Sequence, residues 1–260
     1  MSVWYDVHGE GPAVVLVHAG IADSRMWEPQ LDSFSESHTV VRVDLPGFGH
    51  SEIETNPVSY RGAITEALDA AGVAQTTVVG TSLGGRAALE FAVDAPERVS
   101  ALVLVGSGID DHEWSEQVEV YGTEEETALE RGDVERAVSL NVDFWVAGPR
   151  RTMDEIDPAV RELAVEMQRH ALEQSEGHGD LRAARLDPPA SQRLGDIAVP
   201  TLVVTGDEDV EDIHVIADRL ARDIPGAERA HIVGAAHLPN LERPEEFNRI
   251  VLGFLGRHGA

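Results

Sequence analysis

The sequence predicts an α/β domain built around a mainly parallel sheet, and two observations carry this prediction. Short apolar runs rich in Val and Leu recur along the chain, as is typical of strands that are buried on both faces. Stretches with helical spacing lie between several of these runs, so strands and helices alternate as crossover units do in a parallel sheet. The chain has 260 residues, of which 42% are hydrophobic, and is therefore large enough to bury a core.

The expected elements follow one another from the N-terminus. Residues Val3–His8 are expected to form an edge strand that pairs antiparallel through the turn Gly9-Glu10-Gly11-Pro12. Strands are expected next at Val14–Val17, Val40–Val43, Thr76–Val79, Ala101–Val105, Leu202–Thr205 and Glu228–Val233. Helices are expected at Tyr60–Ala71, Leu83–Val93 and Pro244–Leu255.

Residues 110–189 interrupt this alternation. They contain no convincing strand run, and their apolar residues show helical spacing, as in Val134, Ala137 and Val138. We therefore expect a helical insertion between two parts of one core, residues 1–109 and 190–260. An insertion at this point is placed to act as a lid over a site, and the alternative is a helical layer without that role.

Composition excludes several classes of function. The chain has no cysteine, so disulfides, thiolate metal sites and cysteine nucleophiles are excluded, and its 20 basic residues are all arginine, which excludes lysine Schiff bases. The formal net charge of -27 disfavours nucleic acid and anionic membranes as partners. We expect a small-molecule substrate, and the sequence leaves homo-oligomerisation open. The first residues lack the features of a signal peptide and no apolar run approaches the roughly 18 residues of a membrane helix, so the expected location is cytoplasmic.

The clearest local motif is Gly80-Thr81-Ser82-Leu83-Gly84, which fits the pattern G-x-S-x-G. The pattern alone is weak. Its context strengthens it, because an expected strand runs into it and an expected helix runs out of it. A sharp strand-to-helix turn exposes a serine oxygen and places backbone N–H groups beside a developing oxyanion. Ser82 is therefore a candidate nucleophile.

A serine nucleophile needs a base, and the C-terminal part of the chain supplies candidates. His237 lies in a loop of small residues directly after the last expected strand, and the acidic run Asp207-Glu208-Asp209 follows the strand before it. The chain order is serine, acid, histidine, as expected for a triad on this kind of sheet. All of these residues stand where strands end, at the edge where open α/β sheets hold ligands.

With these motifs in this order, the chain resembles the α/β-hydrolase superfamily over nearly its whole length. The segments that carry the resemblance are His18-Ala19-Gly20, Asp44–Ser51, the turn at Ser82, Gly206–Asp209, Gly234–His237 and Leu241–Phe247. The resemblance implies a mostly parallel eight-stranded sheet flanked by helices. It also implies a helical lid inserted after the sixth of those strands, which is the strand that ends at Val105.

The resemblance implies a role for each site residue. Ser82 is the nucleophile, His237 the general base and acid, and Asp209, three residues after Gly206, the third member of the triad. Asp207, Glu208 and the pair Asp110 and Asp111 are the alternative acids. The oxyanion hole is formed by the amides of Leu83 and Gly20, with Ile21 as the alternative to Gly20. No cofactor is implied, and the histidines show no metal-ligand spacing.

The activity that follows is hydrolysis of a small carboxylic ester or lactone through an acyl-enzyme. Serine at position 82 excludes haloalkane dehalogenases and epoxide hydrolases of this fold, which use a carboxylate there. Carbon–carbon bond hydrolases remain an alternative, although many carry an aromatic residue where this chain has Leu238. Cofactor-free haloperoxidases or perhydrolases share the same triad. A slow-turnover ligand receptor is the alternative outside the enzymes.

Substrate specificity is expected to come from the insertion. Phe144, Trp145 and Met153 could line an apolar pocket, and Arg150 or Arg151 could bind a substrate carboxylate. The competing interpretations are packing within the lid for the apolar residues and surface ion pairs for the arginines.

Overall fold

The computed structural model of the protein describes residues 3–176, 178 and 182–258. Its centre is a seven-stranded sheet in the order β1-β3-β2-β4-β5-β6-β7. The strands are β1 (Tyr5–His8), β2 (Ala13–Val17), β3 (Thr39–Val43), β4 (Thr76–Thr81), β5 (Val99–Val105), β6 (Thr201–Gly206) and β7 (Glu228–Ile232). None of the helices in the described ranges is long and apolar enough to cross a bilayer.

The edge strand β1 is antiparallel, as expected, and every other pairing is parallel. The expected hairpin is wrong, however, because β1 pairs with β3 rather than with β2, the next strand along the chain. Both edges of β2 are already occupied, by β3 on one side and β4 on the other. The described residues form seven strands instead of the eight that the resemblance implies. Only a short turn separates β1 from β2, so no further strand lies between them.

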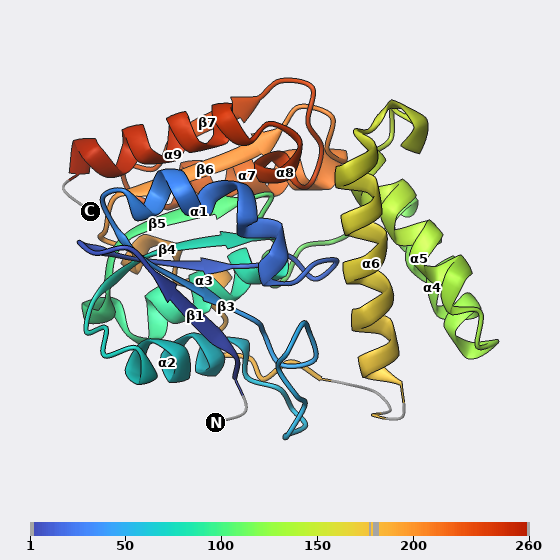
Figure 1. Ribbon diagram of the computed structural model, residues 1–260, viewed down its shortest axis with the longest axis horizontal. Coiled ribbons are helices and arrows are strands. Elements are labelled where there is room, and N and C mark those ends of the chain that lie inside the picture. Colours follow the sequence, from blue (N-terminus) through green and yellow to red (C-terminus); the bar gives the residue numbers. More distant parts are fainter. Residues whose placement is uncertain (1–2, 177, 179–181, 259–260) are drawn as a thin grey trace.

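Side-chain alternation along the strands builds two cores, one on each face of the sheet. Val14 and Leu16 pack in the cluster that includes α1 (Glu28–Ser35) and α9 (Pro244–His258). Val15 and Val17 pack on the opposite face, in the cluster that includes α2 (Tyr60–Ala70), α3 (Leu83–Asp94) and α7 (Glu211–Asp223). Figure 1 shows α1 and α9 on one side of the strands and α2 and α3 on the other. The strands β2 to β6 are thus buried on both faces, which explains their apolar runs, whereas the edge strands β1 and β7 are only partly buried.

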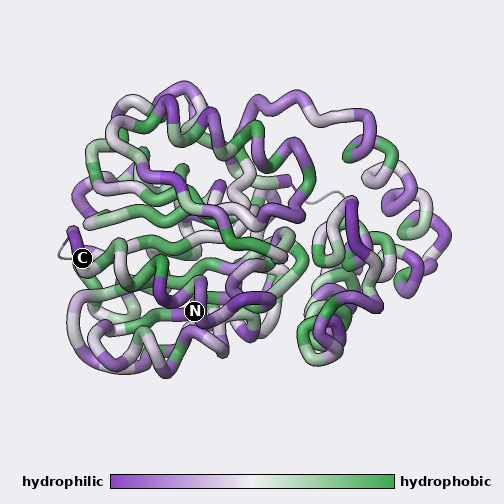
Figure 2. Tube along the Cα trace, turned by 90° about the horizontal axis from the view of Figure 1, so that it is seen from above, coloured by the Kyte–Doolittle hydropathy of each residue, from purple (hydrophilic) through white to green (hydrophobic). Residues whose placement is uncertain are grey.

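The insertion after β5 is helical, as the sequence predicts. It contains α4 (Glu116–Glu130), α5 (Val134–Asn141), a π-helical segment η3 (Val142–Ala147), a short turn η4 (Met153–Glu155) and α6 (Pro158–Ser175). These helices lie beyond the carboxyl ends of the parallel strands (Figure 1) and form a lobe beside the core when seen from above (Figure 2). The insertion therefore faces the edge of the sheet at which the strands leading to the candidate site residues end.

Candidate active site

Ser82 occupies a strained turn between β4 and α3. Its φ of 54° lies in the left-handed region, which a residue with a side chain rarely adopts. The turn requires two glycines, because a Cβ at Gly80 would lie 2.3 Å from the carbonyl oxygen of Gly84. A Cβ at Gly84 would lie 2.4 Å from the carbonyl oxygen of Val17. The tight approach of α3 to β2 and β4 therefore holds Ser82 at the first turn of the helix, at the carboxyl end of the sheet.

His237 and Asp209 form a buried hydrogen bond. His237 Nδ1 lies 2.9 Å from Asp209 Oδ2, and each residue is only 1% exposed. The other carboxylate oxygen of Asp209 accepts a hydrogen bond of 2.8 Å from the amide of Val210. The loops that carry the pair are pressed together, since a Cβ at Gly206 would lie 2.2 Å from the carbonyl oxygen of Ala235. The geometry thus orients the imidazole through Nδ1 and leaves Nε2 as its second functional atom.

The other candidate acids are engaged elsewhere. Asp207 accepts a hydrogen bond of 2.6 Å from the amide of Gly234, and Glu208 pairs with Arg150 at 2.7 Å. The two remaining acids, after β5, pair with arginines: Asp110 with Arg185 and Asp111 with Arg219. Of these acids, only Asp209 is hydrogen-bonded to His237.

Ser82 and His237 both lie beside the loop that follows β5. The amide of Ser82 donates to the carbonyl of Val105 at 2.9 Å, and the amide of Gly108 donates to the carbonyl of Ser82 at 3.1 Å. In the same loop, a Cβ at Gly106 would lie 3.3 Å from Nδ1 of His237. Within the described ranges, neither Ser82 Oγ nor His237 Nε2 has a hydrogen-bond partner. Both atoms therefore remain available to a substrate.

The two predicted oxyanion donors are neighbours. A Cβ at Gly20 would lie 3.5 Å from the Cβ of Leu83, so the loop after β2 passes beside the first turn of α3. No part of the chain that the structure describes accepts a hydrogen bond from the amide of Gly20, Ile21 or Leu83. His18 stabilises this loop from inside the protein, because its Nε2 accepts from the amide of Leu45 at 2.9 Å. Burial lowers the pKa of His18 and so favours the neutral ring that this contact needs.

A cavity of about 330 Å³ opens beside Ser82. Its lining comes from α3, from the loop after β5, from the insertion and from α7: Ser82, Leu83, Arg86, Gly108, Ile109, Asp110, Asp111, His112, Trp114, Trp145, Arg185 and Ile213. The π-helical segment η3 brings Trp145 into this lining, and the indole ring centroid lies 4.5 Å from that of His237. Trp145 is thus the predicted substrate-binding residue that the structure places beside both Ser82 and His237.

The other predicted substrate-binding residues lie outside this cavity. Phe144 stacks on Tyr121 with ring centroids 4.3 Å apart, because it points to the α4–α5 side of the insertion. Met153 packs against the apolar cluster that includes α1 and α9 and is not among the lining residues of the cavity. Arg150 is held at the surface by Glu208.

The alternative arginine, Arg151, is not available to a substrate either. It pairs with Glu242 at 2.7 Å and also donates to the backbone carbonyls of Val146 and Gly234. Its guanidinium therefore fastens the insertion to the loop before His237.

Sequence reasoning missed Arg86, His112, Trp114 and Arg185 as lining residues, and it considered Asp110 and Asp111 only as triad acids. Arg86 carried a readable signal, because it stands four residues after Ser82 and so lies one helical turn further along the same face of α3. The other residues come from distant parts of the chain, and no local pattern marked them.

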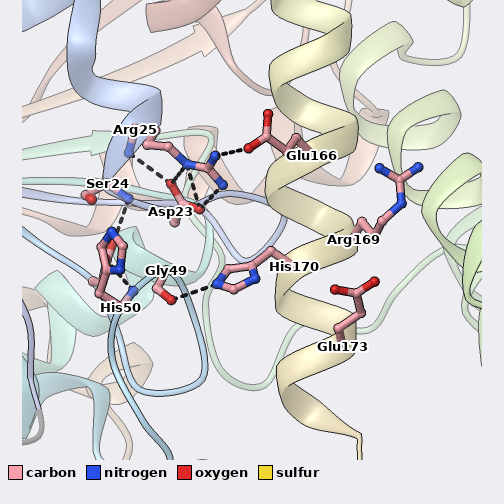
Figure 3. A pocket seen from close by; sticks show the side chains of 10 residues that line it. Asp23, Ser24, Arg25, Gly49, His50, Glu166, Arg169, His170 and Glu173 are labelled. Atoms are coloured by element: carbon pink, nitrogen blue, oxygen red, sulfur yellow. Dashed lines mark hydrogen bonds and ion pairs between the residues drawn. The ribbon is translucent and has the colours of Figure 1, made fainter.

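A second cavity, of about 350 Å³, lies between the core and α6 and does not include Ser82. Figure 3 shows Arg25 reaching both Asp23 and Glu166, while Arg169 and Glu173 have no marked contact with the other residues drawn. Arg25 binds Asp23 at 2.8 Å and also contacts Glu166 of α6, while His170 of α6 lies 2.9 Å from the carbonyl oxygen of Gly49. Within the described ranges, no group of His, Asp and Glu residues is arranged to hold a metal ion.

Comparisons with known proteins agree with this architecture. The family model described as alpha/beta hydrolase fold matches residues 12–131. A putative carbamate hydrolase, RutD of Variovorax paradoxus, is 30% identical over 275 positions, which cover 100% of this chain and 98% of the relative. The carboxylesterase YbfK of Bacillus subtilis is 26% identical, with 95% of this chain and 81% of the relative covered.

A similar fold occurs among solved structures. The enol-lactonase from Burkholderia xenovorans LB400 superposes with a TM-score of 0.79 at 22% identity, covering 98% of this chain and 96% of that one. Together with the match to the family model and the 30% identity to a relative of nearly equal length, the topology shows that this chain belongs to the α/β-hydrolase fold family.

Proposed function

We propose that the protein is a serine hydrolase that cleaves a small carboxylic ester or lactone through an acyl-enzyme intermediate. The observation that carries the proposal is the buried hydrogen bond of 2.9 Å between Asp209 and His237, next to a strained serine turn that opens into a cavity. The similarity to a carboxylesterase and to an enol-lactonase supports this choice of bond type.

In the proposed mechanism, His237 acts as the general base. With its Nδ1–H donating to Asp209, the imidazole presents the lone pair of Nε2 and removes the proton of Ser82 as the serine oxygen attacks the substrate carbonyl. The Asp209 carboxylate stabilises the imidazolium that forms. His237 then returns the proton to the leaving alcohol, and a second cycle with water releases the acid and restores Ser82.

The tetrahedral intermediates carry a negative oxygen, for which we assign the amides of Leu83 and Gly20 as donors. Their proximity and their lack of acceptors within the described ranges support this assignment. Such preorganised donors contribute most to catalysis when charge develops on the substrate oxygen. Leu83 also begins α3, so the helix N-terminus adds its positive dipole there.

We further assign residues 110–189 the role of a lid. Two contacts of Trp145 support it, since its carbonyl accepts a hydrogen bond of 3.3 Å from the amide of His237 and its ring packs on the imidazole. A residue of the insertion therefore touches the proposed base and also lines the cavity beside Ser82.

The test compares the wild type with Ser82→Ala on a panel of p-nitrophenyl esters and simple lactones. We expect the wild type to hydrolyse members of the panel and Ser82→Ala to lose at least about a thousandfold in kcat. Ser24→Ala is the matched control, because Ser24 is a buried serine that lines the cavity of Figure 3 instead. A folded wild type without activity on the panel, or equal activity in Ser82→Ala, would contradict the proposal.

A further inference from the structure

Two arginines line the cavity beside Ser82, and their environments differ. Arg185 forms an ion pair with Asp110, which also lines the cavity. Arg86 has no hydrogen bond or ion pair through its guanidinium with any part of the chain that the structure describes. Arg86 is therefore the cation of this cavity that remains open to a ligand.

Arg86 is also held close to the reacting residue. It lies in the first turn of α3, and its amide donates a hydrogen bond of 3.0 Å to the carbonyl of Ser82. The backbone between the two residues is thus a closed helical turn, and both side chains line the same cavity of about 330 Å³. A small substrate attacked by Ser82 could therefore reach the guanidinium.

Glu90, one helical turn after Arg86 in α3, interacts with the charge of Arg86 but forms no ion pair with it. Glu90 is 3% exposed, and burial raises the pKa of its carboxyl group despite the opposing charge of Arg86. Its Oε1 has no hydrogen-bond partner within the described ranges, and its Oε2 lies 3.9 Å from Arg61, which also pairs with Asp94. Two carboxylates of the cavity wall, Asp110 and Asp111, pair with Arg185 and Arg219, so the described residues leave the guanidinium of Arg86 without an ion-pair partner.

The unpaired guanidinium of Arg86 contrasts with the net charge of the molecule. At a formal net charge of -27, the protein repels anions at long range. The arginines that sequence reasoning chose for a carboxylate, Arg150 and Arg151, are both occupied by glutamates. Recognition of an anionic substrate would therefore depend on Arg86.

We propose that Arg86 binds a carboxylate on the substrate, and that the preferred substrates are esters or lactones bearing a free carboxylate group. The proposal rests on the proposed hydrolase function. A guanidinium presents paired N–H donors that match the two oxygens of a carboxylate, so one group supplies both charge and orientation. Arg86 is in this role a specificity-determining residue, while the bond cleavage is left to Ser82 and His237.

The first experiment measures the ratio of kcat/KM for an acidic substrate to kcat/KM for its neutral ester. A general loss of activity lowers both values and so cancels in this ratio. kcat/KM is determined for mono-p-nitrophenyl glutarate and for methyl p-nitrophenyl glutarate. In the second compound the methyl ester blocks the carboxylate, and the leaving group is the same. A second pair, acetoxybenzoate and its methyl ester, places the carboxylate in the leaving group. We expect the wild type to favour the acid in at least one pair, and Arg86→Met to lower that acid-to-ester ratio about tenfold to a hundredfold.

Two further variants separate recognition from structure. Arg86→Lys keeps the charge but not the paired donors, so its ratio should fall between those of the wild type and Arg86→Met. Arg136→Met removes the same charge from an exposed site on α5 and should leave the ratio unchanged. A ratio that is the same in Arg86→Met as in the wild type, for both pairs, would overturn the proposal.

A binding measurement keeps the inference independent of turnover. Calorimetric titration of Ser82→Ala with monomethyl glutarate and dimethyl glutarate should show at least tenfold tighter binding of the monoester, and the added change Arg86→Met should abolish that preference. This result without ester hydrolysis by the wild type would refute the proposed function, and with it the ester and lactone substrates, but would still support carboxylate binding by Arg86. Equal binding of the two ligands would refute the inference, whatever the hydrolysis assay shows.

Discussion

The cavity beside Ser82 and the cavity of Figure 3 are similar in size and both contain charged residues, yet they differ in how those charges are paired. In the cavity of Figure 3, Arg25 binds Asp23 and Glu166. Arg169 also lines this cavity, and it pairs with Glu135 of α5, which lies outside the lining. In the cavity beside Ser82, the guanidinium of Arg86 has no such partner in the described part of the chain. Ionic groups that satisfy one another hold a structure together, whereas an unpaired one beside a nucleophile can select a substrate.

A buried aspartate in each cavity region allows a direct test of this difference. Asp209 contacts the proposed base, and Asp23 binds an arginine that links the core to α6. Their exposed fractions are 1% and 2%, so burial alone does not distinguish them. Replacing each with asparagine should therefore separate a loss of catalysis from a loss of stability.

The largest effect is expected for Asp209→Asn. An amide at this position would donate to Nδ1 of His237, force the proton onto Nε2 and so remove the lone pair that activates Ser82. We expect kcat on the best p-nitrophenyl ester to fall about ten-thousandfold. Asp207→Asn is the control, because an amide oxygen can still accept from Gly234, and its kcat should stay within about tenfold of wild type. Equal losses in the two variants would argue against Asp209 as the triad acid.

A smaller effect, on stability, is expected for Asp23→Asn. Burial alone would raise the pKa of Asp23, but the hydrogen bonds and charge of Arg25 outweigh it and hold the pKa below the ordinary value of 3.8. At neutral pH the ionised carboxylate thus stabilises the folded state, and its loss should lower the free energy of unfolding by about 1–2 kcal/mol. kcat should stay close to that of the wild type.

The pH dependence of this stability difference has a definite sign. Because the folded pKa lies below the unfolded one, the contribution of Asp23 is present above about pH 3.8 and disappears as the pH falls through the folded pKa. Urea unfolding of the wild type and Asp23→Asn at pH 7 and at a series of acidic pH values measures it. A difference that stays constant down to the lowest pH would show that the ion pair is not its source.

The smallest effect is expected for Glu166→Gln, which breaks the contact between α6 and Arg25. Glu166 is 67% exposed, and ion pairs between exposed groups contribute about 0–1 kcal/mol. The loss measured by urea unfolding should decrease further when salt is added, because salt screens exposed charges. A loss well above 1 kcal/mol would mean that this contact holds the insertion to the core more strongly than its exposure suggests.

Sequence patterns predicted most of the sheet, because strands buried on both faces must be apolar at nearly every position, as Val14–Val17 and Ala101–Val105 are. The same patterns could not predict which strands pair. The strand β1 was expected to form a hairpin with its neighbour in sequence, but β2 had both edges occupied by parallel partners. Pairing depends on the whole sheet, and a local pattern carries no information about it.

The candidate site shows the same division. Ser82 and His237 stand in glycine-rich and alanine-rich loops at strand ends, and such loops are visible in a sequence. The resemblance favours Asp209 over Asp207, but the residues alone leave both possible, because the contact between His237 and Asp209 depends on how closely two loops approach at Gly206. Phe144 and Arg150 were chosen by residue type, but the direction in which each side chain points is set by the packing of the insertion.

The sequence by itself determined the order of strands and helices, the glycines that the serine turn needs, and the chain order of serine, acid and histidine. These features depend on local sterics and on hydrophobic periodicity, which neighbouring residues set among themselves. Only the tertiary structure decided which acid contacts His237, which part of the insertion reaches the cavity, and which arginine remains unpaired. Those outcomes depend on residues far apart in the chain competing for the same partners, and that competition is settled only when the core has packed.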